Sequence, residues 1–249
     1  MALQRLITGA SKGIGLAMTR RGLEAGDRVF AVSRAPDASP ALAALRRRFP
    51  DRLHPLAADL TDDKDIAALA TGMRDWTDTL DTLVNCAGVL HDGALGMMPE
   101  KRVEDLDPAL LSRMFALNAF APVLLAKHFF PLLRHDRRAV FASLSARVGS
   151  IEDNRLGGWY AYRASKAAQN QFLRTFAVEA RRRAQNLIVL ALHPGTVETD
   201  LSAPFRRNVP AGQLFSSDFA AECLLGHIDR AGEQDSGGFF AWDGARIPW

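Results

Sequence analysis

The sequence predicts an α/β fold, a single doubly wound domain in which helices flank a parallel seven-stranded sheet. The first observation is that short, continuous apolar runs alternate with stretches of helical periodicity from the first residues onward. Strands that are apolar throughout are typical of parallel sheets covered on both faces. The second is that no repeat, low-complexity tract or flexible linker divides the 249 residues. We therefore expect one domain over residues 1–249.

The elements follow from these patterns in chain order. Short apolar runs predict strands at Leu3–Ile7, Arg28–Val32, Leu53–Ala57, Thr82–Asn85, Ala139–Leu144, Leu187–Leu192 and Gly238–Ala241. Helical periodicity predicts helices at Ile14–Ala25, Ala41–Phe49, Ile66–Met73, Pro108–Leu133, Tyr160–Arg183 and Asp218–Ile228. Gly26 supplies a stop signal for the first of these helices. In such sheets ligands bind at the carboxyl ends of the strands, so the loops after the strands should carry the functional residues.

The composition is that of an ordinary globular protein, with 48% hydrophobic and 24% charged residues and a formal net charge of +3. The basic runs Arg46–Arg48 and Arg181–Arg183 lie near the ends of predicted helices, where they complement the helix dipole. No aromatic residues interleave with them, as a stacking platform for single strands would require. We expect no nucleic-acid partner.

Two cysteines are too few for a disulfide framework, and nothing pairs them with metal-ligand spacing, so we expect no metal site. The first residues show no charged leader followed by an apolar run, and we expect a cytoplasmic protein. The most apolar region, Phe115–Leu133, is interrupted by Asn118, Pro122, Lys127 and His128. It therefore indicates a core helix rather than a membrane span.

A glycine-rich stretch, residues 8–15, follows the first strand and opens the first helix. It reads Thr-Gly-Ala-Ser-Lys-Gly-Ile-Gly. Glycines let the backbone approach a pyrophosphate, and a helix N-terminus supplies N–H groups and partial positive charge. A tight turn without a ligand is the alternative, but the position in a βαβ unit favours a dinucleotide site. The expected contacts are Gly9, Ser11, Lys12, Gly13, Ile14 and Gly15.

The second strand is followed by Ser33 and Arg34, where an NAD-specific site would place an acidic residue for the ribose 2′-hydroxyl. Arg offers bidentate hydrogen bonds to phosphate oxygens, and Lys12 lies in the preceding loop. Solvated surface charges are the alternative. The three coincident features favour NADP(H) over NAD(H) as the cofactor.

Asn118 lies in the long apolar helix, four residues before Pro122. Proline has no N–H, so the Asn118 carbonyl loses its usual helical partner and is free to bind water or another donor. The alternative is a kinked core helix whose amide caps an internal group. We interpret Asn118 as a residue of the functional site.

Tyr162 and Lys166 are four positions apart at the start of the helix expected over Tyr160–Arg183. That spacing puts both side chains on one helix face, about one turn apart. A phenol has a reference pKa of about 10, and an ammonium group beside it favours the phenolate. We therefore expect Lys166 to lower the pKa of Tyr162, so that the pair exchanges a proton near neutral pH.

Motifs spread over residues 3–200 resemble, in order, those of the short-chain dehydrogenase/reductase family. They include the Gly-x-x-x-Gly-x-Gly spacing of the first loop, the Tyr-x-x-x-Lys pair and the Pro194-Gly195 turn. The long loop from Gly149 to Tyr160 and the ending Ala241-Trp242-Asp243-Gly244 resemble more narrowly the branch of C-factor-like and sniffer-type carbonyl reductases.

The resemblance implies a Rossmann-type, NAD(P)-binding domain and assigns further roles. Contacts to the adenine and ribose side of the cofactor would come from Asp59, Leu60, Asn85, Ala87 and Gly88. Contacts to the nicotinamide side would come from Tyr162, Lys166, Pro194, Gly195, Val197 and Thr199. Asn118 would relay through water to Lys166, and a substrate loop over about residues 197–215 would close over the substrate. The family also implies a homodimer or homotetramer.

The loop after the strand Ala139–Leu144 departs from the family pattern of two adjacent serines, two residues and a glycine. If Gly149 is the anchor of that pattern, the usual catalytic serine falls on Ala146. Ser145, one residue earlier, is the best candidate to hydrogen-bond a substrate carbonyl, and the alternatives are Ser143 and Ser150.

Together the residues and the resemblance predict an NADPH-dependent oxidoreductase that reduces a ketone, aldehyde or quinone. In this reading Tyr162 donates the proton, Ser145 orients the carbonyl oxygen, and Lys166 and Asn118 support Tyr162. The alternative is an NAD(P)-binding signalling or regulatory protein of C-factor type with vestigial activity.

Overall fold

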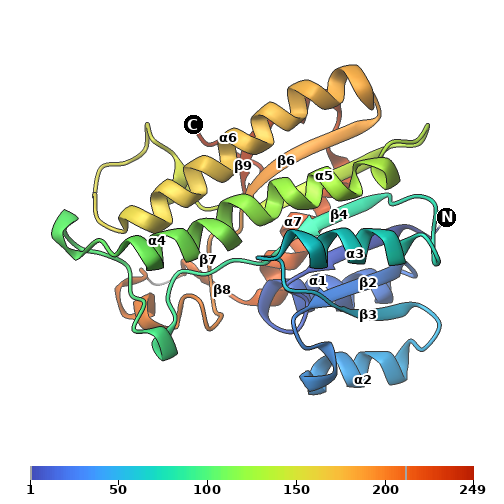
Figure 1. Ribbon diagram of the computed structural model, residues 1–249, viewed down its shortest axis with the longest axis horizontal. Helices are drawn as coiled ribbons and strands as arrows, with labels where there is room; N and C mark the ends of the chain where they lie inside the picture. The colour runs from blue at the N-terminus through green and yellow to red at the C-terminus, as the bar shows by residue number, and fades with distance from the viewer. Residues whose placement is uncertain (1, 211) are drawn as a thin grey trace.

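The computed structural model describes residues 2–210 and 212–249. Seven parallel strands form one sheet in the order β3-β2-β1-β4-β5-β6-β9. Helices cover both faces of this sheet (Figure 1). Because both faces are covered, the central strands are buried along almost their whole length. The doubly wound α/β fold predicted from the sequence is confirmed.

The strands of the sheet are β1 (Gln4–Thr8), β2 (Arg28–Ser33), β3 (Leu53–Ala57), β4 (Thr82–Asn85), β5 (Ala139–Leu144), β6 (Leu187–His193) and β9 (Gly238–Ala241). The α-helices are α1 (Gly13–Glu24), α2 (Pro40–Arg48), α3 (Asp63–Met73), α4 (Pro108–Phe115), α5 (Ala121–Leu133), α6 (Tyr160–Arg183) and α7 (Ser217–Arg230). Helices α1, α2 and α7 share one apolar layer, and α3, α5 and α6 share the other.

The strand order reverses between β1 and β4, because the chain first builds outward to β3 and then returns to the other side of β1. A crevice forms at such a switch point, outside the carboxyl ends of the strands. The loops after β1 and β4 therefore face each other at the point where a ligand is expected.

The helix predicted over Pro108–Leu133 is interrupted by a π-helical turn at Ala116–Phe120, between α4 and α5. The N–H of Ala121 bonds to the carbonyl of Ala116, five residues back. Pro122 supplies no N–H at the next position, which explains why the regular α-helical pattern is broken here. Asn118 lies inside this π-helical turn.

The same stretch, Pro108–Leu133, is long and apolar enough to cross a membrane by length and composition, with a mean hydropathy of 1.6. Leu125 and Phe129, however, are fully buried within the apolar layer that packs on the sheet. Helix α5 therefore packs in the core, as predicted for the most apolar region, Phe115–Leu133.

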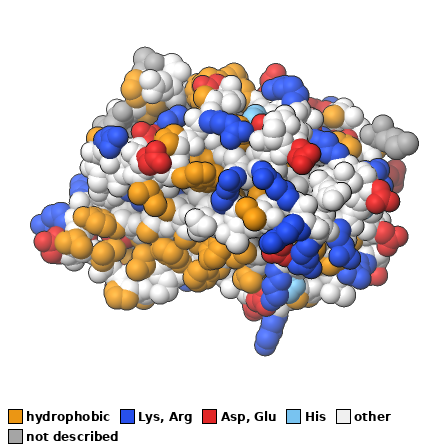
Figure 2. Space-filling model, turned by 90° about the horizontal axis from the view of Figure 1, so that it is seen from above, with side chains coloured by type: hydrophobic (Ala, Val, Ile, Leu, Met, Phe, Trp, Pro, Cys, Tyr) orange, Lys and Arg blue, Asp and Glu red, His pale blue; other side chains and the backbone are white. Residues whose placement is uncertain are grey.

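Both basic runs occupy the last turns of helices α2 and α6, as the sequence predicts. Arg48 pairs with Glu24 at 3.0 Å, and Arg183 pairs with Glu179 one turn earlier. Figure 2 shows Lys and Arg side chains most densely toward the right of one face, with hydrophobic side chains toward the lower left.

The segment that the resemblance marks as a substrate loop, residues 197–215, contains regular structure. It includes the end of a short strand, β7 (Thr196–Val197), a 3₁₀-helix at Ala203–Asn208 and a second short strand, β8 (Leu214–Phe215). Strands β7 and β8 pair in parallel as a separate two-stranded sheet. Residue 211 lies outside the described residues.

An ion pair lies near the start of β1, at the opposite end of the strand from the candidate site. The Nε of Arg5 in β1 lies 2.6 Å from Oδ2 of Asp27, and both side chains are more than nine-tenths buried. Nη2 of Arg5 lies 3.0 Å from Asp229 in α7, which is half exposed. Asp27 also accepts the backbone N–H of Leu3 at 3.0 Å, so this group ties the first strand to both neighbouring segments.

We predict that Asp27→Ala lowers the free energy of unfolding by about 3 kcal/mol, because it leaves the buried Arg5 charge without its main partner. Asp229→Ala is the matched control, and its cost is expected to stay below about 1 kcal/mol because that carboxylate is half exposed. Urea unfolding followed by circular dichroism measures both. Equal losses in the two variants would contradict the assignment of Asp27 as the main partner.

Candidate active site

The loop after β1 is shaped by glycines that other residues could not replace. Gly9 has a φ of +63°, and a β-carbon there would lie 3.0 Å from the backbone nitrogen of Ala87 in the loop after β4. A β-carbon at Gly15 would lie 2.4 Å from the carbonyl oxygen of Gly9. The loops after β1 and β4 are therefore in close contact, and α1 starts directly at Gly13. This is the geometry of a backbone cradle for phosphate at a helix N-terminus.

The structure places Lys12 differently from the sequence-based expectation. Its Nζ lies 2.7 Å from Oδ2 of Asp200, and both side chains are about three-quarters exposed. The hydrogen bond from Lys12 holds the pKa of Asp200 below its usual value. Thr199 lies against Gly13, so the loop after β1 is in contact with the segment that follows β7.

Ser33 and Arg34 lie at the carboxyl end of β2, next to the loop after β1. Oγ of Ser33 is buried and has no hydrogen-bond partner among the described residues. Arg34 is exposed. The pKa of Asp59 is lowered chiefly by hydrogen bonds from Thr61, and the positive charge of Arg34 lowers it further. An unpartnered hydroxyl beside an exposed guanidinium fits a ribose phosphate, which accepts hydrogen bonds from both.

Asp59 and Asn85 are both hydrogen-bonded within the protein, Asp59 at the surface and Asn85 in the interior. Asp59 accepts both the backbone N–H and the hydroxyl of Thr61, while the helix α3 is capped by Asp62. Asn85 accepts the hydroxyl of Thr8 at 2.6 Å and donates to Oγ of Ser143 at 2.9 Å. Asn85 therefore fastens the ends of β1, β4 and β5 to one another. Leu60 is buried beside these residues, and Ala87 and Gly88 are half-buried.

Asn118 bridges the loop after β4 and helix α6. Its Oδ1 accepts the N–H of Val89 at 2.8 Å, and its Nδ2 donates to the Val89 carbonyl at 2.8 Å and to Oγ of Ser165 at 3.2 Å. The side chain is fully buried. We call this set the Asn118 bridge. The predicted role of the Asn118 backbone carbonyl stays a prediction, whereas the side-chain amide binds internal groups, as the alternative interpretation expects.

Tyr162 and Lys166 lie on one face of α6, with Nζ of Lys166 5.9 Å from the centre of the Tyr162 ring. Nζ donates to the Leu144 carbonyl at 2.8 Å and to Oε1 of Gln169 at 2.9 Å. A β-carbon at Gly88 would lie 3.3 Å from Oδ1 of Asn118 and 3.7 Å from Nζ of Lys166. Tyr162, Lys166 and Asn118 thus converge beside the ends of β4 and β5.

The pKa of Tyr162 does not follow the expectation that Lys166 lowers it. Burial raises the pKa of Tyr162 above its ordinary value, and burial lowers the pKa of Lys166 to about 7. The reason is that both groups are removed from water, which disfavours the charged form of each. Tyr162 is therefore protonated at neutral pH, the state that a proton donor needs.

The hydroxyls of the three candidate serines are hydrogen-bonded to other groups of the protein. Ser145 donates to Oδ1 of Asn170 at 2.6 Å, and Ser143 accepts from Asn85 and Gln169. Ser150 donates to the carbonyl of Trp249 at 3.2 Å. All three are buried. Their positions fasten strand β5 and its loop to α6 and to the end of the chain.

Tyr162 also belongs to a cluster of apolar side chains. We define the Tyr162 cluster as the buried residues Leu90, Met97, Met114, Ala161 and Tyr162, with half-buried neighbours that include Ala146, Val148, Trp159, Leu201 and Phe205. The cluster draws on the loop after β4, the loop after β5, the start of α6 and the segment 197–215. It forms the wall beside which a substrate would meet the Tyr162 hydroxyl.

The loop after β6 leads from the sheet into β7. Pro194 and Gly195 are half-buried and lead into β7, where Val197 is buried. Gly195 lies against the rings of Phe215 and Trp242. The N–H of Thr199 bonds to Oγ of Ser202 at 3.3 Å, which turns the chain toward the loop after β1.

Sequence reasoning missed Gln169, Ser165 and Trp159. Gln169 and Ser165 lie within one turn of Lys166, so the helical spacing that pointed to Lys166 could have found them. Trp159 precedes α6 with a φ of +53°, a conformation that the sequence pattern does not reveal.

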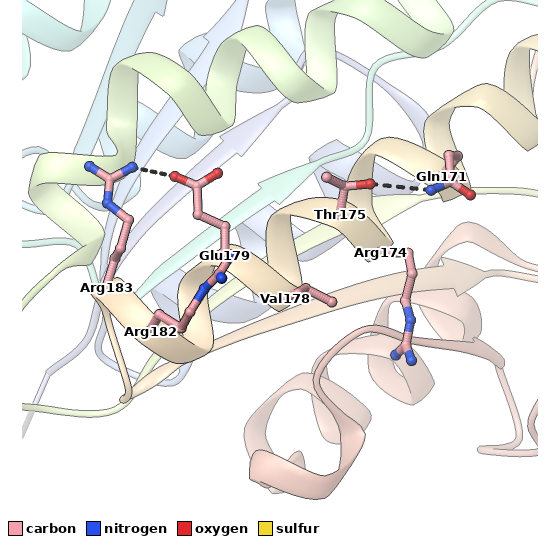
Figure 3. Close-up of a pocket in the computed structure, with 7 residues that line it drawn as sticks. All are labelled: Gln171, Arg174, Thr175, Val178, Glu179, Arg182 and Arg183. Carbon is pink, nitrogen blue, oxygen red and sulfur yellow. Dashed lines mark hydrogen bonds and ion pairs between the residues drawn. The ribbon is translucent and has the colours of Figure 1, made fainter.

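A groove of about 680 Å³ lies elsewhere, along the outer face of the second half of α6 (Figure 3). Several of its polar groups are partnered: Gln171 donates to Thr175, Arg183 pairs with Glu179, and Arg174 donates to the carbonyl of Gly237. It holds none of the converging residues, so the candidate active site is the one around Tyr162.

A phosphate cradle and a buried tyrosine and lysine at the switch point of a parallel sheet define a nicotinamide-dependent oxidoreductase fold. The family model of short chain dehydrogenases matches residues 5–210. The chain belongs to this family. The C-signal protein of Myxococcus xanthus is 34% identical over 174 residues, which cover 70% of this chain and 95% of that protein.

Solved structures of carbonyl reductases are similar over the whole chain. Carbonyl reductase Sniffer of D. melanogaster superposes with a TM-score of 0.87 at 25% identity and covers 100% of both chains. An NADPH-bound carbonyl reductase from chicken fatty liver superposes with a TM-score of 0.87 at 28% identity, covering 100% of this chain and 99% of that one. The predicted family and branch are confirmed.

We predict that stability rises with pH because of Lys166. The unfolded chain keeps the lysine proton up to about pH 10.4, whereas the folded chain loses it near pH 7. Between these values the unfolded state binds more protons, so raising the pH favours folding. From pH 7 to 9 the free energy of unfolding of the wild type should rise by about 2 kcal/mol relative to Lys166→Met. Parallel pH profiles for the two proteins, measured by urea unfolding, would contradict this.

Proposed function

We propose that the chain is an NADP(H)-dependent oxidoreductase that reduces a carbonyl group, in a ketone, aldehyde or quinone, to an alcohol. The observation that carries this proposal is the convergence of Tyr162, Lys166 and Asn118 beside the phosphate cradle of the loop after β1. A protonated tyrosine at this position suits reduction, because the carbonyl oxygen must gain a proton as it gains charge.

The preference for NADP(H) rests on the carboxyl end of β2. Ser33 offers a buried, unpartnered hydroxyl, and Arg34 is exposed without an ion pair among the described contacts. Both can donate to a 2′-phosphate, and no carboxylate stands there to bind a 2′-hydroxyl. Lys12 is engaged by Asp200, so we assign the recognition of the phosphate to Ser33 and Arg34. The NADPH-bound neighbour agrees with this preference.

When bound, the reduced cofactor supplies a hydride to the carbonyl carbon. The chain's own residues then act on the oxygen: Tyr162 donates its hydroxyl proton to the oxygen as charge develops. Lys166 is fixed by the Leu144 carbonyl and Gln169. In its protonated form it places a positive charge one helical turn away, which favours the tyrosinate that remains. The Tyr162 cluster excludes water from the reacting atoms.

The segment over residues 197–215 is proposed as the substrate loop of this single domain. It is joined to the loop after β1 by the exposed Lys12–Asp200 pair, and Phe205 from this segment packs on Trp159 beside Tyr162. Exposed ion pairs contribute little to stability. The segment is therefore held weakly enough to open for substrate entry and product release.

We also propose an oligomeric state and a cellular compartment for this protein. A homodimer or homotetramer through α5 and α6 is supported by Phe120 and Val178, large apolar side chains at or on these helices that are 45% and 46% exposed. Light scattering measures the mass in solution. A cytoplasmic location is supported by Cys86 and Cys223, which are both free thiols.

A second candidate is an NAD(P)-binding signalling or regulatory protein with weak activity. The similarity to the C-signal protein and the presence of Ala146 at the position of the usual catalytic serine favour it. A measurement of turnover distinguishes the enzyme from the signalling protein. Tight NADPH binding without turnover of any compound in a broad carbonyl panel would favour the signalling role.

We predict that Tyr162→Phe lowers kcat for an o-quinone with NADPH by about 100-fold or more, because it removes only the donor hydroxyl. The dissociation constant for NADPH, measured by fluorescence titration, should change less than threefold and serves as the control for folding. A variant that keeps more than a third of the wild-type rate would exclude Tyr162 as the proton donor.

We predict that Arg34→Asp weakens NADPH binding at least tenfold more than NADH binding, because it replaces the phosphate donor with a carboxylate. Arg182→Asp, at an exposed arginine in the last turn of α6, is the control for a change in overall charge. Titration of each cofactor measures the ratio of the two dissociation constants. An equal loss for both cofactors would rule out recognition of the 2′-phosphate by Arg34.

A further inference from the structure

Helix α6 begins without a cap of its own. Its N-cap residue, Trp159, makes no side-chain hydrogen bond to the helix, and the first turn contains no acidic residue. Trp159 has a φ of +53°, and Gly157 and Gly158 before it each have a φ of +63°. The first N–H groups of a helix have no partner within the helix, so a buried helix end needs acceptors from elsewhere. Tyr162 is the third residue of α6, so its position depends on how this end is held.

Glu100, from the segment between β4 and α4, supplies the missing cap. Its Oε2 accepts the N–H of Ala161, the second residue of α6, at 3.2 Å. Its backbone carbonyl accepts the N–H of Trp159 at 2.6 Å. An N-cap side chain normally accepts the N–H of the second or third helical residue. A carboxylate that is distant in the sequence therefore takes the place of the N-cap side chain.

The burial of Glu100 is explained by this contact rather than by an ion pair. The residue is only 8% exposed, and a buried polar group costs free energy unless it is hydrogen-bonded. Arg102, two residues later, pairs with Asp105 instead. The N-terminus of a helix carries partial positive charge, which favours an anion there. The carboxylate of Glu100 thus lies where the end of α6 stabilises it.

Closed turns on both sides of Glu100 fix its position. Before it, Asp92 and Met97 exchange two backbone hydrogen bonds of 2.9 Å each. After it, Oδ2 of Asp105 accepts the N–H of Arg102 at 3.1 Å. Met97 is also a buried member of the Tyr162 cluster. The segment that holds the carboxylate therefore also supplies part of the apolar surface beside the catalytic tyrosine.

Arg163 holds the residues just before α6, but not the helix itself. Its guanidinium donates to the carbonyls of Gly158 and Gly157 at 3.0 and 3.2 Å, and to the carbonyl of Val148 at 3.3 Å. These bonds tie the turn before the helix to the loop after β5. The carboxylate of Glu100, in contrast, bonds directly to an N–H group of the first helical turn.

We propose that Glu100 is a positioning residue for Tyr162. Its carboxylate fixes the start of α6, and thereby the place of the Tyr162 hydroxyl relative to the reacting carbonyl. This inference rests on the proposed function, in which Tyr162 donates the proton. A proton donor must lie within hydrogen-bond reach of the oxygen that receives the proton. A misplacement of about 1 Å costs on the order of 100-fold in rate.

The first test compares two variants of Glu100, using NADPH and an o-quinone at a temperature where circular dichroism shows both to be folded. Glu100→Ala removes the acceptor and should lower kcat at least tenfold, while the dissociation constant for NADPH changes less than threefold. Glu100→Gln keeps an acceptor oxygen at the same reach and should retain kcat within threefold. A Glu100→Gln variant as impaired as Glu100→Ala overturns the proposal, because the hydrogen bond would then not be the cause.

Asp62→Ala is the matched control, because it removes the carboxylate cap of a different helix, α3. It should unfold at a lower urea concentration than the wild type and retain kcat within threefold. If Glu100→Ala behaves in the same way, with a loss of stability and an unchanged kcat, Glu100 is only a structural cap and the proposal is overturned.

The second test asks whether the effect of Glu100 passes through Tyr162. In a Tyr162→Phe background the donor hydroxyl is absent, so its position no longer matters. Glu100→Ala should then cost less than threefold in kcat, against at least tenfold in the wild-type background. Losses that multiply in the double variant overturn the proposal.

Glu100→Asp carries the test should Glu100→Ala fail to fold. It keeps the charge but shortens the reach by one methylene, so kcat should fall at least tenfold, and a kcat within threefold of the wild type overturns the proposal. A large effect of Tyr162→Phe with none from Glu100 removes this inference and leaves the proposed function intact. A Tyr162→Phe variant with more than a third of the wild-type rate removes both.

Discussion

The Asn118 bridge is the interaction on which the rest of the site depends. A single buried amide joins the loop after β4, through Val89, to helix α6, through Ser165. Because Ser165 directly precedes Lys166, the bridge fixes the position of the lysine relative to the ends of β1 and β4. The π-helical turn that Pro122 favours brings Asn118 into this place. Small residues at 87 and 88 leave the space that the bridge needs.

Removal of water is the second constraint, and it shifts the pKa values of Tyr162 and Lys166 in opposite directions. Burial keeps Tyr162 protonated and brings the pKa of Lys166 to about 7. The ammonium group is partly compensated by the Leu144 carbonyl and by Gln169. The site therefore holds a lysine at a cost in stability, as is common where ionisable groups are tuned for proton transfer.

Much of the fold could be predicted because strand and helix periodicities are local. Strand Ala139–Leu144 and helix Tyr160–Arg183 have the predicted bounds, and the spacing of Tyr162 and Lys166 placed both on one face. The directions of the serine hydroxyls depend on how β5 twists against α6, which spacing does not contain. The rise in the Tyr162 pKa depends on burial by segments that are distant in the sequence. The π-helical turn at Asn118 depends on hydrogen bonds that span five residues instead of four.

The most direct measurement of the central claim is a double-mutant cycle on kcat/KM for NADPH-dependent carbonyl reduction, with Asn118→Ala and Lys166→Met. If Asn118 acts by positioning Lys166, removing it should cost nothing further once the lysine is gone. The account predicts that the double variant lies within about threefold of the more impaired single variant. Losses that multiply would show that Asn118 and Lys166 act independently, and would contradict the dependence of the site on the Asn118 bridge.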